Sequence, residues 1–440
     1  MLLFIYMTER KTHSSRSVDG MKAILFNKYK YFSIKNAIYR NFSLFTCVFK
    51  AYRYRLYPTS TQKELIAKHI GCSRFVYNLA LETKNTAYLG SKVNLSTFDL
   101  INQLPDLKKE CPWLKEVNSQ SIQQSVINMD IAFKQFFKGS GFPRFKSKDR
   151  GKQSFHIPQS VIVDDEKSEL IIPKFKKKGI KINLHREIKG EIKSATITRT
   201  PTDKYFVSIL VDTQTEAPPK AKIAEDTAIG IDLGIKDFAI TSEGEVFNNP
   251  KHLRKAMDKL KFIQRKYSKH KGKQTRHRLA LLHEKVANKR KDFLHKTSTQ
   301  LIRENQTIAL ETLAVKNMIK NHNLAQAIAD ASWSTFVDMM EYKAEWNGNN
   351  ILRIGTFSPS SKTCSSCGHL HKELQLADRT WICGGCGAEH DRDVNAAVNI
   401  KSFALKKLFS GTERKNQDEL PTLVGVMTPE AQPIALGVGG

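Results

Sequence analysis

The chain has 440 residues, enough for two or three domains and at least one sizeable core. Its 71 lysines and arginines against 43 aspartates and glutamates give a formal net charge of +28, which is too large for a typical enzyme of small metabolites and indicates a polyanionic partner, usually a nucleic-acid phosphate backbone. The alternative of a membrane surface lacks support, because no stretch approaches the roughly 18 apolar residues of a transmembrane helix and no lipidation motif accompanies the basic segments.

The first segment, residues 1–48, differs from the rest of the chain because it is basic, aromatic and without a periodic pattern. Its opening run MLLFIYMTERK places the charges after the apolar residues, the reverse of a secretory signal, so we expect a cytoplasmic protein. Residues 1–48 are predicted to be an extension, either disordered or added by a mis-called start; the alternative is an ordered accessory segment. From Phe49, FKAYRYRLYPT alternates like a strand and ends at a proline turn.

Residues 60–150 are predicted to form a helical domain. Apolar residues recur at helical spacing through Leu65, Ile66 and Ile70, and prolines divide the region into several helices. The domain ends in a basic loop punctuated by glycine and proline, GSGFPRFKSK at 139–148.

Strand patterns return after this loop. SATITRT and KYFVSILVD alternate apolar and polar residues on either side of a turn at 201–203, and EAPPKAK at 216–222 is typical of a linker. Residues 49–59 and 151–218 are therefore predicted to build one β-rich domain.

A new domain begins near Ala228, where AIGIDLGIKDFAITSEG has the pattern of strand, turn and strand. A long helical stretch at 251–305 carries 18 lysines and arginines against four acidic residues. The strands TIALETL and ILRIGT then enclose an amphipathic helix. This alternation predicts an α/β domain over 226–356 and 390–408, followed by a disordered tail at 409–440.

Residues 357–389 contain two C-x2-C-G pairs with 15 residues between the inner cysteines: Cys364 with Cys367, and Cys383 with Cys386. Each pair places two thiolates on one tight turn, and two such turns supply the tetrahedral four-sulfur set that a structural zinc ion prefers. We therefore predict a zinc ribbon; two local disulfides are the alternative. Three nearby histidines could replace a ligand, although four cysteines already fill the shell: His369, His371 and His390.

Acidic residues stand at three places where a metal site could form. Asp232 lies at the end of the strand IGIDLG, Glu311 interrupts the apolar strand TIALETL, and Asp391 and Asp393 in DRDVNAAVNI precede a helix. Each has an ordinary alternative, respectively a turn residue, a solvent-facing strand residue and a helix N-cap. Together, in a very basic protein, they indicate one shared site, because carboxylates hold the Mg²⁺ pair that supports phosphodiester hydrolysis.

The order of these motifs resembles that of the TnpB (OrfB-type) transposon proteins, small relatives of type V CRISPR effectors. GIDLGIKDFA, IALETL and CSSCG…CGGCG…HDRDVNAAVNI carry the resemblance, and FKAYRYRLYPT, GCSRFVYN, GFPRFKSK and ADASWSTF extend it over roughly residues 49–405. The resemblance implies an α+β multidomain fold. The parts it implies are an RNase H-like (RuvC) α/β nuclease domain with an inserted four-cysteine zinc ribbon, a β-barrel wedge domain and a helical recognition lobe.

The resemblance also implies a site and its partners. Asp232, Glu311 and Asp393 match the three catalytic acids that bind magnesium, and Asp393 is preferred to Asp391 because the family's acid directly precedes the x-N-A-A segment. Family members pair a guide RNA from the transposon end with target DNA and cleave that DNA by two-metal hydrolysis; no membrane is involved. Candidate nucleic-acid contacts, each alternatively an ordinary surface or supporting residue, are Arg53, Arg55, Arg74, Asn78, Arg144, Lys146 and Arg392.

Two other functions stay open at this point. One is a non-catalytic nucleic-acid-binding regulator of transposition, and the other is a transposase that acts without a guide. The presence of all three acids argues against the first, and activity after removal of RNA would indicate the second.

Overall fold

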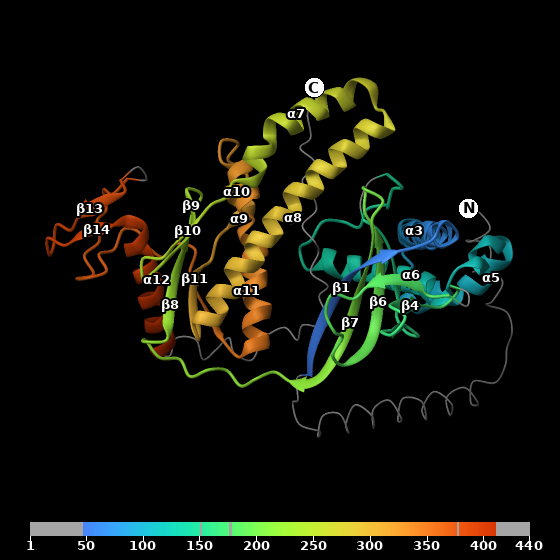
Figure 1. The fold of residues 1–440 in the computed structure, drawn as a ribbon, viewed down its shortest axis with the longest axis horizontal. Coiled ribbons are helices and arrows are strands. Elements are labelled where there is room, and N and C mark those ends of the chain that lie inside the picture. The colour runs from blue at the N-terminus through green and yellow to red at the C-terminus, as the bar shows by residue number, and fades with distance from the viewer. Residues whose placement is uncertain (1–46, 150–151, 176–177, 376–377, 411–440) are drawn as a thin grey trace. The chain divides into compact units, whose positions relative to one another are not determined.

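The computed structural model describes residues 47–410, apart from 150–151, 176–177 and 376–377 (Figure 1). The chain divides into two compact units, Met1–Glu216 and Ala217–Gly440. The predicted extension at 1–48 and the predicted tail at 409–440 lie outside the described residues, except for two residues at the inner end of each. Within the described ranges, no helix is both long and apolar enough to cross a membrane.

The described part of the first unit contains the helices that the periodicity predicts. They are α3 (Ser60–Ser91), α4 (Thr97–Asn102), α5 (Leu104–Glu110), the 3-10 helix η1 (Pro112–Glu116) and α6 (Ser119–Phe137). A capping box starts α3, since the Thr59 hydroxyl accepts from the Gln62 backbone and the Gln62 side chain accepts from the Thr59 backbone. Prolines stand in the first turns of α5 and η1, where a missing N–H costs little, so the predicted division by prolines is confirmed.

The same unit contains a seven-stranded sheet in the order β2-β6-β7-β1-β5-β4-β3. The strands are β1 (Cys47–Tyr57), β2 (Gln153–Ile157), β3 (Ile162–Asp164), β4 (Glu169–Ile171), β5 (Ile180–Asn183), β6 (Glu191–Arg199) and β7 (Tyr205–Glu216). Every pairing is antiparallel. Alternate residues such as Tyr54, Val207 and Ile209 point inward and bury Ile66 and Ile70 of α3 against the sheet.

The predicted β-barrel is wrong in its closure. Among the described residues, the outer strands β2 and β3 pair only with β6 and β4, respectively, so the sheet is open. A barrel requires the first and last strands to pair with a consistent stagger. Alternation along a strand predicts which side chains face inward, but it carries no information on whether the two edges meet.

The second unit is built on a five-stranded mixed sheet in the order β10-β9-β8-β11-β12. Its strands are β8 (Ala228–Leu233), β9 (Asp237–Thr241), β10 (Val246–Asn248), β11 (Thr307–Glu311) and β12 (Asn350–Ile354). β11 runs parallel to both β8 and β12, whereas β9 is antiparallel to β8. The predicted α/β character of this part of the chain is confirmed.

Helices cover both faces of this sheet (Figure 1). On one face, Leu301 of α8 (Lys273–Glu304) and Phe336 of α11 (Trp333–Asn347) join the core formed by Ile229 and Ile231. On the other face, Ile400 and Ala404 of α12 (Arg392–Phe409) pack against Ala309 and Ile354. The buried strands are apolar on both sides for this reason, as is usual where helices cover both faces.

The predicted basic helical stretch folds into a hairpin of α7 (His252–His270) and α8 (Figure 1). Asp330 of α10 (Ala325–Ala331) secures its base, because the carboxylate accepts from the Leu253 N–H at 2.9 Å and from the Arg290 guanidinium at 2.9 Å. α7 starts at Lys251 without a side-chain cap of its own. Asp330 therefore supplies the cap from a distant segment and fixes where the hairpin begins.

Candidate functional site

Asp232 and Glu311 lie at the carboxyl ends of neighbouring parallel strands. β8 and β11 pair in register as far as Ile231 and Leu310, and the two acids directly follow these residues. Parallel strands bring their carboxyl ends to one edge of the sheet, where ligands commonly bind. Both acidic side chains are half-buried at that edge, so Glu311 is not simply a solvent-facing strand residue.

The helix α12 brings Asp393 to the same region. It crosses β8 at Gly230, where an added Cβ would lie 2.0 Å from the Ala397 carbonyl oxygen and 2.8 Å from the Lys401 nitrogen. Only glycine permits so close an approach of helix and strand. Because Asp393 is in the first turn of α12, this contact determines how near its carboxylate comes to Asp232.

The charges of Glu311 and Asp393 both act on Asp232. Burial, together with the negative charges of Glu311 and Asp393, raises the pKa of Asp232 to about 7 against the opposing effect of Arg392. Burial also raises the pKa of Glu311. Charges act on a pKa in this way only at short range. The three carboxylates therefore interact electrostatically in a protein that is otherwise strongly basic.

Asp391 and Asp393 have different roles in the helix start. Asp391 is the N-cap of α12, and its Oδ1 accepts from the backbone N–H groups of Asp393 and Val394, both at 3.0 Å. Its oxygen is therefore engaged in capping, as expected for an Asp before a helix. Asp393 makes a different contact, an ion pair in which the Arg379 guanidinium lies 3.1 Å from Oδ2 and 3.3 Å from Oδ1.

The donor set suits a hard divalent cation such as Mg²⁺, because all three groups are carboxylates. In the described part of the chain, the four cysteine sulfurs lie within 4.8 Å of one another. The carboxylate oxygens of the three acids do not converge as tightly. Like charges oppose a closer approach of the acids, and Arg379 draws the Asp393 carboxylate to its own side.

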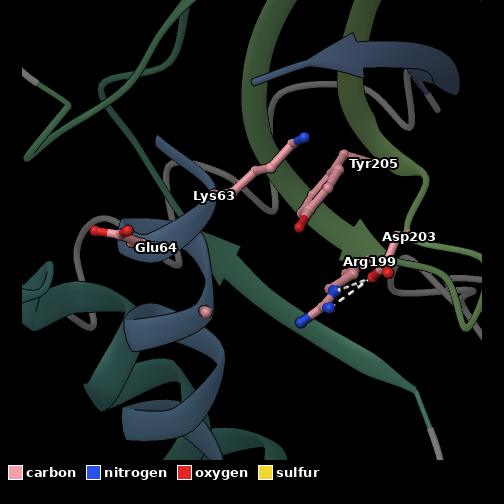
Figure 2. Close-up of a pocket in the computed structure, with 6 residues that line it drawn as sticks. Lys63, Glu64, Arg199, Asp203 and Tyr205 are labelled. Carbon is pink, nitrogen blue, oxygen red and sulfur yellow. Dashed lines mark hydrogen bonds and ion pairs between the residues drawn. The ribbon is translucent and has the colours of Figure 1, made fainter. Parts of the chain in front are cut away.

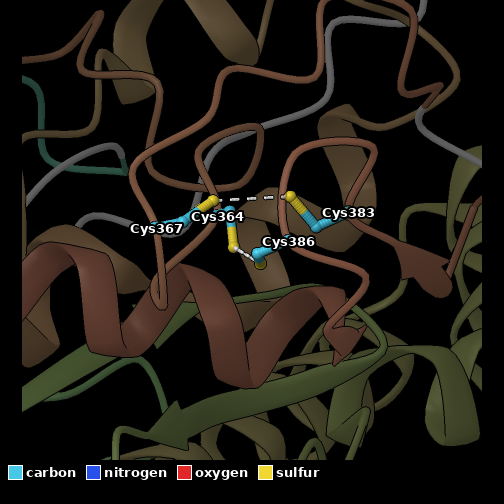
Figure 3. A group of neighbouring side chains, drawn as sticks. All are labelled: Cys364, Cys367, Cys383 and Cys386. Carbon is cyan, nitrogen blue, oxygen red and sulfur yellow. Dashed lines mark hydrogen bonds between the residues drawn. The ribbon is translucent and has the colours of Figure 1, made fainter.

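Four cysteines converge in the ribbon that joins β12 to α12 (Figure 3). The Cys364 and Cys386 sulfurs are 3.7 Å apart, and those of Cys367 and Cys383 are 3.6 Å apart. A tetrahedral zinc site with bonds of roughly 2.3 Å requires sulfurs about 3.8 Å apart, so the cluster has the spacing of a zinc centre. The close contacts join one cysteine from each pair, which excludes the alternative of two local disulfides.

The three histidines near the ribbon stay outside the cysteine group. His390 comes nearest, with Nε2 3.0 Å from the Cys364 sulfur in a buried position between Cys364 and the Trp381 ring. A hydrogen bond to a thiolate stabilises the ligand without replacing it. The ribbon strands β13 (Thr380–Ile382) and β14 (Glu389–Asp391) pair here and lead directly into α12.

Two buried asparagines, which the sequence reasoning missed, attach the ribbon to α12. The Asn395 amide donates to the Thr363 carbonyl at 2.8 Å and its oxygen accepts from Ser365 N–H at 2.9 Å. Asn399 donates to the carbonyls of Ser360 and Thr363 at 2.8 and 2.6 Å. Their spacing of four residues in DRDVNAAVNI, which puts both on one helix face, was the available signal.

Several of the predicted nucleic-acid contacts bind the protein itself. Arg74 donates to the Gln153 side chain at 3.2 Å, and Asn78 holds the Lys146 backbone through two hydrogen bonds of 2.7 and 2.9 Å. The Lys146 ammonium lies 3.8 Å from the centroid of the Tyr77 ring. Arg74 and Asn78 therefore stabilise the local structure through these contacts. Their direct contact with nucleic acid remains a prediction.

The other predicted contacts differ in their surroundings. Arg53 and Arg55 flank the ring of Phe206 at 4.3 and 5.0 Å on one face of the first unit's sheet. Arg392 donates to the Gln375 carbonyl at 2.9 Å, and Arg144 is exposed on the loop after α6. A row of arginines and aromatic rings is a surface on which nucleic acids bind readily.

A pocket of about 310 Å³ in the first unit contains none of the predicted site residues (Figure 2). It lies between the first turns of α3 and the β6–β7 hairpin, and its lining comprises Lys63, Glu64, Ala67, Arg199, Asp203 and Tyr205. The Arg199 guanidinium is paired with Asp203 at 2.8 Å, as the dashed lines in Figure 2 mark. This internal pairing leaves little net charge for a ligand, so the acids of the second unit remain the better candidate site.

Three protein families match successive parts of the chain. The family described as "Helix-turn-helix domain" matches residues 48–92, "Probable transposase" matches 208–322 and "Cas12f1-like, TNB domain" matches 333–400. The last two matches contain Asp232, Glu311, Asp393 and the four cysteines.

Whole-length relatives agree with these matches. A protein of Streptomyces pristinaespiralis named "Putative RNA-guided DNA endonuclease" is 38% identical over 381 residues, which cover 84% of this chain and 93% of the relative. "Putative RNA-guided DNA endonuclease InsQ" of Escherichia coli (strain K12) is 30% identical, with coverages of 82% and 94%. The solved Cas12f1-sgRNA-target DNA complex contains a chain with a TM-score of 0.50 at 13% identity, covering 81% of this chain and 99% of that one, which shows a shared fold.

Proposed function

The chain belongs to the TnpB (OrfB-type) family of transposon proteins, and from this premise we propose that it is an RNA-guided DNA endonuclease whose catalytic acids are Asp232, Glu311 and Asp393. The observation that supports the proposal is the register of β8 and β11, which brings Asp232 and Glu311 to one edge of the second unit's sheet, together with the interaction of the Asp393 charge with Asp232. Cleavage of a phosphodiester needs an activated water and relief of charge on the leaving oxygen, and carboxylate-held Mg²⁺ supplies both when it is bound.

The chain's own groups prepare the site for that chemistry. Asp232 interacts with both other acids, and its pKa of about 7 means that a substantial share of the molecules carry a proton on it at neutral pH, which a nearby positive charge would displace. Arg392 opposes the rise in pKa and so favours the carboxylate. The paired strands hold Asp232 and Glu311 in fixed register, so the donors need little rearrangement to act together.

The ribbon supports the third acid rather than taking part in the reaction. Its four cysteines are proposed to bind a structural zinc ion, for which their sulfur spacing is suited. Asn395 and Asn399 tie the ribbon to α12, and only six residues separate Cys386 from Asp393. A folded ribbon therefore fixes the start of α12 and, with it, the position of the Asp393 carboxylate.

The basic surface is proposed to hold a guide RNA from the transposon end and the target DNA paired with it. A heteroduplex is recognised largely through its backbone, which calls for broadly distributed positive charge. The α7–α8 hairpin supplies such charge, with 18 lysines and arginines against four acids over 251–305. Apart from Leu260, its first helix has no buried residue, so its basic side chains are available to phosphates.

The test compares cleavage with RNA binding in the same preparations. Protein purified with its RNA should cleave a matching DNA target in the presence of Mg²⁺, and Asp232→Ala should abolish cleavage while RNA binding is unchanged. Asp226→Ala, an exposed acid just before β8, is the matched control and should cleave normally. Cleavage by Asp232→Ala would contradict the catalytic assignment, and undiminished sequence-specific cleavage after removal of RNA would favour a transposase that needs no guide.

A further inference from the structure

The loop after α6 is held in a defined conformation by side chains of α3 and β2. Asn78 accepts the Lys146 N–H at 2.7 Å and donates to the Lys146 carbonyl at 2.9 Å, so it pairs with that residue as a neighbouring strand would. One residue further, the Gln153 amide donates to the Ser147 carbonyl at 3.2 Å, and Arg74 in turn donates to Gln153. This frame fixes the loop backbone.

Two aromatic side chains of this loop have different surroundings. Phe142 packs edge-on against Phe133 and Phe136 of α6, with ring centroids 5.6 and 5.3 Å away, and so anchors the start of the loop. Phe145 is 59% exposed, and among the described residues no aromatic ring lies against it. The frame therefore presents a large apolar ring to solvent from a fixed backbone, although a buried position would be more favourable.

The charges nearest Phe145 in the loop are positive, and Asp149 is the one acidic residue between α6 and β2. Arg144 and Lys148 are exposed on either side of Phe145, and Asp149 follows Lys148, four residues after Phe145. The Lys146 side chain is exposed over part of its length, but its ammonium lies over the Tyr77 ring, where desolvation lowers the pKa of Lys146 to about 8. Lys146 thus contributes to the frame, and Arg144 remains for an external anion.

We propose that Phe145 and Arg144 form a contact for one unpaired nucleotide, in which the Phe145 ring stacks on the base and the Arg144 guanidinium binds the adjacent phosphate. An exposed ring next to cationic groups is the combination that single-stranded nucleic acids recognise, because every base has a π-face and every nucleotide a phosphate. A rigid backbone reduces the entropy lost on binding. The inference rests on the proposed function for the identity of the partner as nucleic acid, and RNA and DNA strands share the required chemistry.

Binding of short strands to the full-length protein tests this contact. The probes are roughly 20-nucleotide unpaired RNA and DNA strands of the same sequence and the corresponding DNA duplex. Phe145→Leu, which keeps apolar volume but removes the ring, should weaken binding of at least one unpaired strand by about 5- to 150-fold and leave the duplex within about twofold. Phe145→Trp should restore the affinity, and the strand that responds identifies the source of the nucleotide.

Controls separate stacking from general effects. Phe98→Leu removes a ring from α4 of the same unit that is even more exposed, at 71%, and should not alter the affinity for any probe. Arg144→Gln should reduce the slope of affinity against salt concentration by about 0.7 to 0.9, the value expected for one lost phosphate contact. Unchanged affinity of Phe145→Leu for both unpaired strands, or a lowered thermal midpoint with unchanged affinity, would overturn the proposal and indicate that Phe145 packs within the protein.

The outcome is distinguishable from a failure of the proposed function. DNA cleavage by the wild-type protein with its guide RNA is measured in parallel. If the wild type cleaves and Phe145→Leu binds normally, the contact proposed for the loop is wrong and the endonuclease assignment stands. If the wild type neither binds RNA nor cleaves DNA, the proposed function itself fails.

Discussion

Asp232 and Glu311 occupy equivalent places on adjacent parallel strands, each one residue beyond the pair formed by Ile231 and Leu310. This register places two acids at one sheet edge, and the charge of Glu311 contributes to the raised pKa of Asp232. Such an arrangement does not stabilise the fold, because the effects of burial and of the neighbouring carboxylates on Asp232 outweigh that of Arg392. The pair is therefore best explained by a function that uses the concentrated negative charge.

Neutralising Asp232 should stabilise the metal-free protein while it abolishes cleavage. The folded-state pKa of about 7 lies above the ordinary aspartate value of 3.8, so the folded state holds this proton more tightly, and stability from this group is lost as the pH rises through 7. We expect Asp232→Asn to raise the thermal midpoint in chelator at pH 8 but hardly at pH 4. Thermal denaturation at the two pH values measures this, and a lowered midpoint at pH 8 would show that the carboxylate is not under repulsion.

Asp393 and Asp391 should respond differently to the same substitution. Asp393→Asn removes a proposed metal ligand and should abolish cleavage. Asp391→Asn keeps an oxygen that can accept from the Asp393 and Val394 N–H groups, so activity should fall far less. Single-turnover cleavage rates distinguish the two, and an equal loss would mean that the N-cap also participates in the reaction.

Asp391→Ala offers a further comparison at the helix start. It removes the cap of α12 and should lower the free energy of unfolding by about 1 kcal/mol. Because the cap orients the first turn that carries Asp393, cleavage should fall with it. Asp391→Asn with lower stability than Asp391→Ala would contradict the capping role.

Gly230 is expected to tolerate no side chain. In Gly230→Ala the new Cβ would collide with the Ala397 carbonyl on α12, which should cost about 1–3 kcal/mol of unfolding free energy and displace Asp393 from its neighbours. Gly71→Ala in α3 is the matched control, since no heavy atom lies within 4 Å of its added Cβ. It should be neutral or stabilise the helix by up to about 1 kcal/mol. Chemical denaturation together with cleavage rates tests both, and normal cleavage by Gly230→Ala would contradict the account of helix placement.

Removal of zinc should impair cleavage indirectly. Cys383→Ser deletes one of the four clustered sulfurs, so the protein should lose about one equivalent of zinc, measured by elemental analysis. Because the ribbon is tied to α12 through Asn395 and Asn399, we expect reduced cleavage with RNA binding retained. Cys72→Ser, at a cysteine outside the cluster, should keep its zinc. Full activity in a zinc-free Cys383→Ser protein would show that the ribbon does not position the third acid.

Much of the second unit could be predicted from local pattern. The apolar runs around Asp232 and Glu311 predict buried strands, and acids at the ends of such strands are unusual enough to indicate a site. The cysteine spacing likewise predicts the cluster that the structure contains. The strand patterns and the cysteine pairs can be recognised in the sequence because each depends on residues close together in the chain.

Other features depend on contacts between distant segments and could not be predicted in this way. Whether the first unit's sheet closes into a barrel depends on whether its two edge strands pair, and the residue pattern within one strand does not determine that pairing. In the sequence, Asn395 and Asn399 cannot be distinguished from ordinary polar helix residues, because their hydrogen-bond partners belong to the ribbon backbone. Arg74 and Asn78, which the resemblance makes candidate nucleic-acid contacts, likewise form hydrogen bonds with Gln153 and the Lys146 backbone that the sequence does not reveal.

The central claim is that Asp232, Glu311 and Asp393 together hold divalent cations against a scissile phosphate. Anomalous X-ray scattering from Mn²⁺ in crystals of the protein with guide RNA and target DNA tests it most directly. We predict anomalous peaks in contact with all three carboxylates and with the phosphate to be cleaved. Manganese bound elsewhere, with the three carboxylates apart and facing solvent, would contradict the account.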